Sequence, residues 1–121
     1  MSNAETEKRG LAIAIQYEKQ RGRNRIVPVR RCGYDLISKN DHEERHIEVK
    51  STEKSHFTFR WLEELEYQKM QSDPNWYLYL VADIYGDNPI VVEYNKEKLE
   101  KLFSGETIKY NYSFPKSDFY P

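Results

Sequence analysis

The sequence lacks several features that would assign it at once to a class of protein. Its single cysteine, Cys32, excludes an internal disulfide, so nothing in the chain requires an oxidising compartment. No apolar run approaches the roughly 20 residues that a membrane-spanning helix needs, and no segment has the pattern of a secretory signal. A Gly-rich phosphate loop and a G-x-S-x-G nucleophile elbow are also missing. We therefore expect a cytoplasmic protein that has no membrane partner.

Aromatic residues make up a large share of the hydrophobic residues in this sequence. Only 38% of the 121 residues are hydrophobic, but 14% are aromatic, which excludes a disordered chain and indicates a core filled largely by Tyr, Phe and Trp. This length suits one hydrophobic core and is too short for two. Ser2-Asn3-Ala4 resembles a scar left by tag cleavage, so the expected single domain spans residues 5–121.

The charge is distributed unevenly along the chain. The net charge is only −1, but residues 8–31 contain eight basic residues and one acid. Such a segment can form a positive face for nucleic acid, and we take Arg21, Arg23 and Arg25 as its candidate phosphate contacts. Arg60 is a further candidate, in the first turn of a helix expected at residues 58–71. The alternative is that these arginines belong to an ordinary solvated surface.

Hydrophobic periodicity and turn residues predict an α/β domain with a mixed β-sheet flanked by helices. The expected order is α-β-β-β-α-β-β-α. The helices are expected at residues 5–21, 58–71 and 96–103, and the strands at 25–29, 34–39, 45–52, 76–84 and 90–94. The second and third strands are separated by a short turn and should form a hairpin. An aromatic tail follows from Thr107 and is expected either to pack on the domain or to meet a partner.

One pair of charged residues in the expected hairpin has the arrangement of a metal-dependent site. Glu48 and Lys50 are two residues apart on a strand and therefore share a face, between Ile47 and Val49 on the other face. Asp35 lies on the partner strand, where its carboxylate can approach Glu48. Two carboxylates suit Mg²⁺, and Lys50 beside them can orient the attacking water or stabilise charge on a phosphate. Glu-x-Lys alone is weak evidence, because both residues are common.

Glu18 is a separate candidate on the first helix. Its spacing from Leu11, Ala14 and Ile15 places it on the apolar face of that helix. An acid there is expected to face the sheet and to reach the metal site or a water bound to it. The alternative is that Glu18 lies near the end of the helix, where that face is already solvated.

Residues 42–46 fit the zinc-protease pattern H-E-x-x-H, and this is the weakest of the functional hypotheses. The pattern binds zinc only on a helix, where histidines four residues apart share a face. Here it begins in a turn and runs into the strand expected at residues 45–52. We therefore interpret it as a chance match.

Together, several sequence blocks closely resemble one family. The blocks are Tyr17-Glu18, Gly22-Arg23, GYDLIS at residues 33–38, RHIEVKST at 45–52 and YLYLV at 77–81. They resemble the nuclease-like domains found at the C-terminus of the plant No-vein protein and in bacterial helicase- and restriction-associated proteins, which are similar to the PD-(D/E)XK superfamily. The resemblance covers about residues 10–81.

This resemblance implies a restriction-endonuclease-like fold and a set of site residues. It implies Asp35, Glu48 and Val49 as ligands of Mg²⁺ or Mn²⁺, Lys50 as the catalytic lysine, and Glu18 as the acid of the family's first helix. The sequence departs from the family at the second helix. Arg60 stands where a Thr is usual, and Glu63 is a loose match for the expected Glu.

The expected function is a Mg²⁺-dependent phosphodiester hydrolase that acts on DNA, in restriction or defence. The expected partners are DNA and either a second copy of the chain or further domains of a larger protein. The alternative from another class is a non-catalytic module that binds nucleic acid or protein and retains the nuclease fold.

Overall fold

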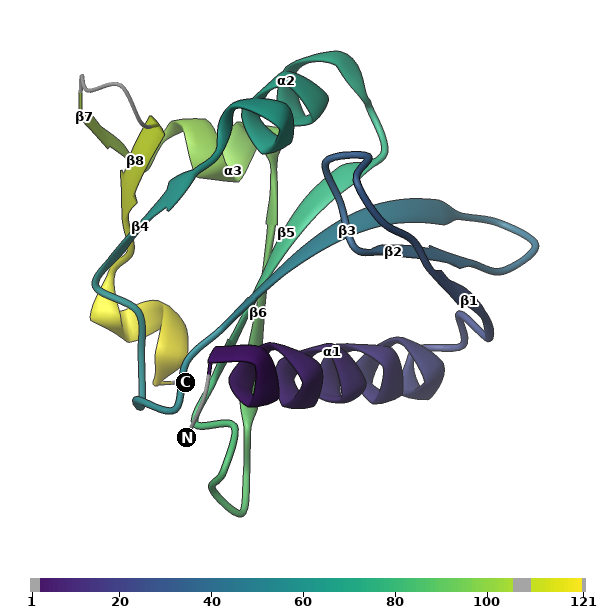
Figure 1. Ribbon diagram of the computed structural model, residues 1–121, viewed down its shortest axis with the longest axis horizontal. Helices are drawn as coiled ribbons and strands as arrows, with labels where there is room; N and C mark the ends of the chain where they lie inside the picture. Colours follow the sequence, from purple (N-terminus) through teal and green to yellow (C-terminus); the bar gives the residue numbers. More distant parts are fainter. Residues whose placement is uncertain (1–2, 106–109, 121) are drawn as a thin grey trace.

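Two β-sheets and the helices packed against them make up the protein (Figure 1). The computed structural model describes residues 3–105 and 110–120. Along the chain the elements are α1 (Asn3–Gln20), β1 (Arg25–Pro28), β2 (Leu36–Lys39), β3 (Glu44–Ser51), β4 (Phe59–Leu62), α2 (Glu64–Ser72), β5 (Trp76–Ala82), β6 (Ile90–Asn95), α3 (Lys96–Glu100), β7 (Phe103–Gly105), β8 (Tyr110–Ser113) and the 3₁₀ turn η1 (Lys116–Phe119). No helix in the described ranges is long and apolar enough to span a membrane.

The larger sheet is mixed, with strand order β1-β2-β3-β5-β6. β1, β2 and β3 are antiparallel neighbours, β3 pairs with β5 in parallel, and β6 returns antiparallel to β5. β5 is the central strand, and its residues from Leu78 to Ala82 are all buried, as its near-continuous apolar sequence predicts for a strand covered on both faces. The predicted mixed α/β sheet and the β2–β3 hairpin are confirmed.

Helix α1 covers one face of this sheet. Ala14 packs there in a buried cluster with Leu36, Ile47 and Tyr79. The helix also approaches β3 very closely, because Gly10 has no side chain: a Cβ at this position would lie 1.6 Å from Ser51 Oγ. This contact fixes the N-terminal half of α1 beside the end of β3. Residues 3 and 4 belong to α1, and residues 1–2 of the expected scar lie outside the described residues.

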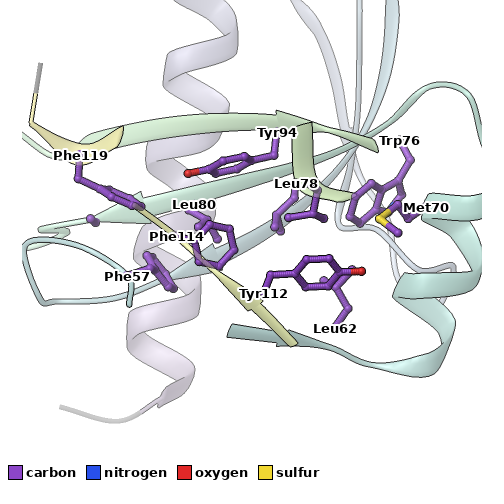
Figure 2. Close-up of a cluster of buried hydrophobic side chains, with 12 residues drawn as sticks. Phe57, Leu62, Met70, Trp76, Leu78, Leu80, Tyr94, Tyr112, Phe114 and Phe119 are labelled. Atoms are coloured by element: carbon purple, nitrogen blue, oxygen red, sulfur yellow. The ribbon is translucent and has the colours of Figure 1, made fainter. Parts of the chain in front are cut away.

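The opposite face is covered by the smaller sheet, of order β4-β8-β7, together with α2 and η1. Leu78 and Leu80 from β5 contact a cluster that contains Tyr112, Phe114 and Phe119 from the C-terminal segment (Figure 2). The part of the aromatic tail that is described therefore packs on the domain. Residues 107–109, where the tail was expected to begin, lie outside the described residues.

The helix predicted at residues 58–71 is wrong in its first part. Phe59–Leu62 forms β4, because it pairs antiparallel with β8 from the far end of the chain. The helix begins only at Glu64, where Glu63 and Glu66 form a reciprocal capping box. The third helix is also shorter than predicted, and the Asn95 side chain caps it by accepting from the Lys98 N–H at 2.9 Å.

A buried polar network joins the C-terminal end of α1 to the larger sheet. Glu18 is fully buried, and its carboxylate accepts from Arg23 Nε at 2.5 Å and Arg23 Nη2 at 2.9 Å. Ser38 Oγ at 3.0 Å and Tyr79 OH at 2.8 Å complete its hydrogen bonds. Burial and the adjacent Glu18 carboxylate raise the pKa of Tyr79, which keeps its hydroxyl a donor. The buried negative charge of Glu18 is tolerated because both of its carboxylate oxygens accept hydrogen bonds.

We expect Arg23→Ala to lower the free energy of unfolding by about 3–5 kcal/mol, because it leaves the Glu18 carboxylate buried and unpaired. The matched control is Arg25→Ala. Arg25 also pairs with an acid, Asp41, but its side chain is 51% exposed, and such a pair contributes about 0–1 kcal/mol. Urea unfolding of the three proteins measures the difference, and equal losses for both variants would contradict the role given to the network.

Candidate active site

The candidate site lies where β2 separates from β3. The pairing of these strands ends at Leu36 and Ile47, just after the Asp35 N–H donates to the Ile47 carbonyl at 2.8 Å. β3 continues to Ser51 without β2 beside it. At this edge the Asp35 carboxylate accepts a hydrogen bond from the Val49 N–H at 2.8 Å, in place of a strand partner. Because the N–H and C=O of one strand residue point to the same side, the Val49 carbonyl also faces this edge.

Glu48 and Lys50 point to the face opposite α1, because they alternate along β3 with Ile47, which packs under that helix. Both are largely buried: Glu48 is 6% exposed, and the Lys50 side chain is 11% exposed. Lys50 Nζ lies 3.4 Å from Glu48 Oε2 and donates to Glu66 Oε2 at 2.9 Å. Asp35, Glu48 and Lys50 therefore meet, and α2 adds a third acid.

Sequence reasoning missed Glu66, which has two structural tasks. Its Oε1 accepts from the Glu63 N–H at 3.0 Å in the capping box, while its Oε2 accepts from Lys50. The start of α2 is thus tied directly to the site. The available signal was the three-residue spacing of Glu63 and Glu66, which is that of a capping box. The family's Thr- and Glu-bearing helix start was placed at Arg60 and Glu63, three residues before the observed start.

Three carboxyl groups around one ammonium make the site strongly unbalanced in charge. Burial raises the pKa of Glu48 well above its ordinary value, and although Lys50 opposes this, Asp35 and Glu66 add to it. Burial also raises the pKa of Asp35, against the lowering effect of the hydrogen bond from Val49. Burial lowers the pKa of Lys50, but Glu48 and Glu66 outweigh it, so this pKa is raised overall. Burial raises the pKa of Glu66, but Lys50 outweighs it, so this pKa is lowered overall. The excess of acid favours a bound cation.

A cleft of about 950 Å³ opens over these side chains. One wall is the N-terminal half of α1, and the other is the connection from β3 to β4 together with β4 itself. The side chains that matter for binding are Thr6, Glu7 and Lys8 on the first wall, Lys54, His56, Thr58 and Arg60 on the second, and Asp35, Glu48, Lys50 and Glu66 between the walls.

The donors present fit Mg²⁺ or Mn²⁺. Asp35, Glu48 and the Val49 carbonyl offer oxygen ligands, and Mg²⁺ binds through one or two carboxylates while it keeps waters and adds substrate phosphate oxygens. Within residues 3–105 and 110–120, no three His, Cys, Asp or Glu side chains are grouped so that they could hold an ion. The arrangement thus differs from a closed structural zinc site, which needs four such ligands.

The structure separates the other predicted residues from this group. Glu18 and Arg23 are buried in the polar network, which lies on the α1 side of the sheet. Arg21 stacks on the ring of Tyr17 at 3.8 Å and pairs with Glu93, at the opposite end of α1 from the cleft. The predicted residues that lie at the cleft are Asp35, Glu48, Val49, Lys50 and Arg60. The predicted residues that lie away from it are Glu18, Arg21, Arg23 and Arg25.

The H-E-x-x-H segment does not form the helical zinc arrangement. His42 lies in a turn, and His46 lies in β3. The two ring nitrogens of His46 contact Asp73 at 2.5 Å and Glu44 at 2.6 Å. The imidazole therefore links β3 to the segment before β5.

The mixed sheet and its flanking helices form a restriction-endonuclease-like fold. The family model "Protein NO VEIN, C-terminal" matches residues 6–94, and the chain belongs to this family. The structure is similar to that of Archaeoglobus fulgidus Hjc, a Holliday junction resolvase from an archaeal hyperthermophile, with a TM-score of 0.58 and 12% identity over 93% of this chain and 83% of that chain. No curated protein sequence matches the chain. The resemblance noted in the sequence and the predicted fold are confirmed.

The His46 contacts predict a pH dependence of stability. Burial lowers the pKa of His46, but Asp73 and Glu44 outweigh it and raise the pKa above its ordinary value of 6.5. A raised pKa means that the stabilising contribution is complete below about pH 6.5 and is lost as the pH rises through the folded-state value.

His46→Phe, which keeps a ring against Tyr34, should remove that loss. The difference in melting temperature between wild type and this variant is then largest in acid and shrinks as the pH rises. His42→Phe, in the exposed turn, serves as the control and should follow the wild type. A difference that grows with pH would contradict the assignment.

Proposed function

We propose that this protein is a divalent-metal-dependent phosphodiester hydrolase that acts on DNA. The observation that carries the proposal is the meeting of Asp35, Glu48 and Lys50 in one cleft, at the edge where β2 leaves β3. Two carboxylates can hold a divalent metal, and an ammonium beside them can stabilise charge on the phosphate. The similarity in fold to a DNA-resolving enzyme supports DNA as the substrate.

Asp35, Glu48 and the Val49 carbonyl are the groups that would hold Mg²⁺ or Mn²⁺. When bound, the metal supplies a water of lowered pKa and neutralises charge on the phosphate. Asp35 has a second task, since its carboxylate also accepts from the Val49 N–H and thereby fixes the direction of the Val49 carbonyl. The Asp35 carboxylate and the Val49 carbonyl are therefore oriented by the same hydrogen bond.

In this proposal the ammonium group of Lys50 contacts the phosphate of the substrate or the attacking water. An ammonium has three donors, and the contacts with Glu48 and Glu66 account for two, which leaves one for a phosphate oxygen or the attacking water. Glu66 is a positioning residue, because it holds Nζ from the start of α2. Arg60 lines the same cleft and lies close enough for its charge to oppose the raised pKa of Lys50, so a second cation lies near the site.

The second candidate is a binding module that retains the nuclease fold. The observation in its favour is the double pairing of Lys50 with Glu48 and Glu66, because such a buried ion cluster can stabilise β3 without any chemistry. The two functions differ in what they require of Lys50.

We expect Lys50→Met to lower the rate of DNA cleavage on the order of 10²–10³-fold, comparable to the loss of one preorganised group that stabilises transition-state charge. Metal and DNA binding should survive, since the carboxylates remain. The rate is measured on plasmid with Mg²⁺ or Mn²⁺, with EDTA as the blank. Lys98→Met, an exposed lysine of α3, is the matched control.

For the binding module, Lys50→Met should instead change stability alone. A buried acid without its partner costs about 1–3 kcal/mol, and any activity would then follow the folded fraction. A wild-type protein that folds, binds DNA and never cleaves it with any divalent metal would contradict the hydrolase.

Asp35→Asn should weaken metal binding first. The amide can still accept from the Val49 N–H, so the fold is kept, but one ligand charge is lost. Even substitutions outside the ligand shell lower metal affinity 10–100-fold, so the Mg²⁺ midpoint should rise by at least about tenfold. The melting temperature as a function of Mg²⁺ measures this without relying on activity, and excess Mg²⁺ should partly restore cleavage. An unchanged midpoint would remove Asp35 from the ligand set.

A further inference from the structure

An exposed tyrosine packs beside a histidine of the cleft wall. Tyr120 follows η1, is 46% exposed, and donates its hydroxyl hydrogen bond to Ser55 Oγ at 2.8 Å. Its ring centroid is 6.1 Å from that of His56, with the two planes tilted by 55°. His56 itself lines the cleft. Two aromatic rings, one from the β3–β4 connection and one from the C-terminal segment, thus form a single patch beside the candidate site.

The backbone behind this patch is fixed by the core. Phe119, next to Tyr120, is fully buried and stacks with Phe57, next to His56, at 6.0 Å (Figure 2). The Phe114 N–H donates to the Thr58 carbonyl at 2.9 Å, which holds the C-terminal segment along the same connection. The backbone beside both rings is therefore already fixed. Binding of a ligand that stacks on the rings would cost the protein little additional conformational entropy.

Cationic side chains accompany the rings. Lys116 Nζ lies 5.5 Å from the centroid of the Tyr120 ring, and Lys54 lines the cleft two residues before His56. Aromatic faces combined with cations are the chemistry that binds single-stranded nucleic acid, where each base stacks and each phosphate meets a positive charge. Duplex DNA does not present its bases in this way, because they are stacked inside the helix.

The basic segment at the other end of α1 is less suited to this role. Arg21 lies thirteen residues beyond Lys8, which corresponds to about 20 Å along a helix axis. Arg21 and Arg25 are also engaged with Glu93 and Asp41. The cations nearest the candidate site are those of the cleft walls.

We propose that His56 and Tyr120, with Lys54 and Lys116 beside them, form a binding site for an unpaired nucleotide next to the nuclease site. The inference rests on the proposed function and names its substrate class: DNA with a single-stranded part, either a free strand or an extension of a duplex. Tyr120 lies outside residues 6–94, which the family model matches.

The test is equilibrium binding of two fluorescent probes, a short oligothymidine and a blunt duplex of the same length, with Ca²⁺ in place of Mg²⁺. Wild type should prefer the single strand. Tyr120→Ala and His56→Ala should each weaken its binding about 5- to 140-fold, the equivalent of losing one base-stacking contact, and leave duplex binding nearly unchanged. Tyr120→Phe keeps the ring and should bind like wild type.

The matched control is Phe103→Ala. Phe103 is an aromatic residue with the same 46% exposure, but it lies on β7 and does not line the cleft. Melting temperatures of all variants separate lost binding from lost folding.

The possible outcomes separate this site from the proposed function. If the alanine variants bind both probes like wild type, or if wild type binds neither probe, the nucleotide site is overturned. Cleavage of duplex plasmid would still support the hydrolase in the first case. If single-strand binding depends on both rings but no divalent metal supports cleavage, the site stands and the hydrolase fails.

Discussion

The hydrogen bond from the Val49 N–H to the Asp35 carboxylate determines where the larger sheet opens. A strand that loses its neighbour leaves backbone donors and acceptors unpaired, and a buried donor of this kind is costly. Asp35 satisfies the donor with a side chain in place of a strand. β2 can therefore turn away while β3 continues, and the same hydrogen bond brings one carboxylate beside the next, that of Glu48. The edge and the candidate site are one structural feature.

This arrangement is costly for the folded chain and is balanced by α2. Glu48 is buried next to two other acids, and burial raises its pKa well above the ordinary value. Lys50 offsets part of this charge but must itself be held in place. Glu66 holds it, and Glu66 is in turn fixed by its capping bond to Glu63. Polar groups with perturbed pKa values at the floor of a cleft are typical of functional sites, where local stability is given up for chemistry.

The sequence predicted what local patterns determine and failed where distant segments meet. The periodicity of α1, the turn of the β2–β3 hairpin and the apolar run of β5 are local, and all three were predicted. β4 has no local signal, because its partner β8 comes from the far end of the chain. Glu18 was placed correctly on the buried face of its helix, but helical spacing does not say which face of the sheet the helix covers. α1 packs over Ile47, whereas Glu48 points to the other side. Charge counting likewise cannot show that Arg23 is neutralised within the fold.

The two walls of the cleft are held in place by different parts of the chain. Apart from the first residues of α1, the floor and both walls come from residues within the family match. The second wall depends on residues after the match, because β8 pairs with β4 and η1 packs Phe119 against Phe57. A chain built in this way can change the shape and charge of the second wall through its C-terminal segment while Asp35, Glu48 and Lys50 stay unchanged.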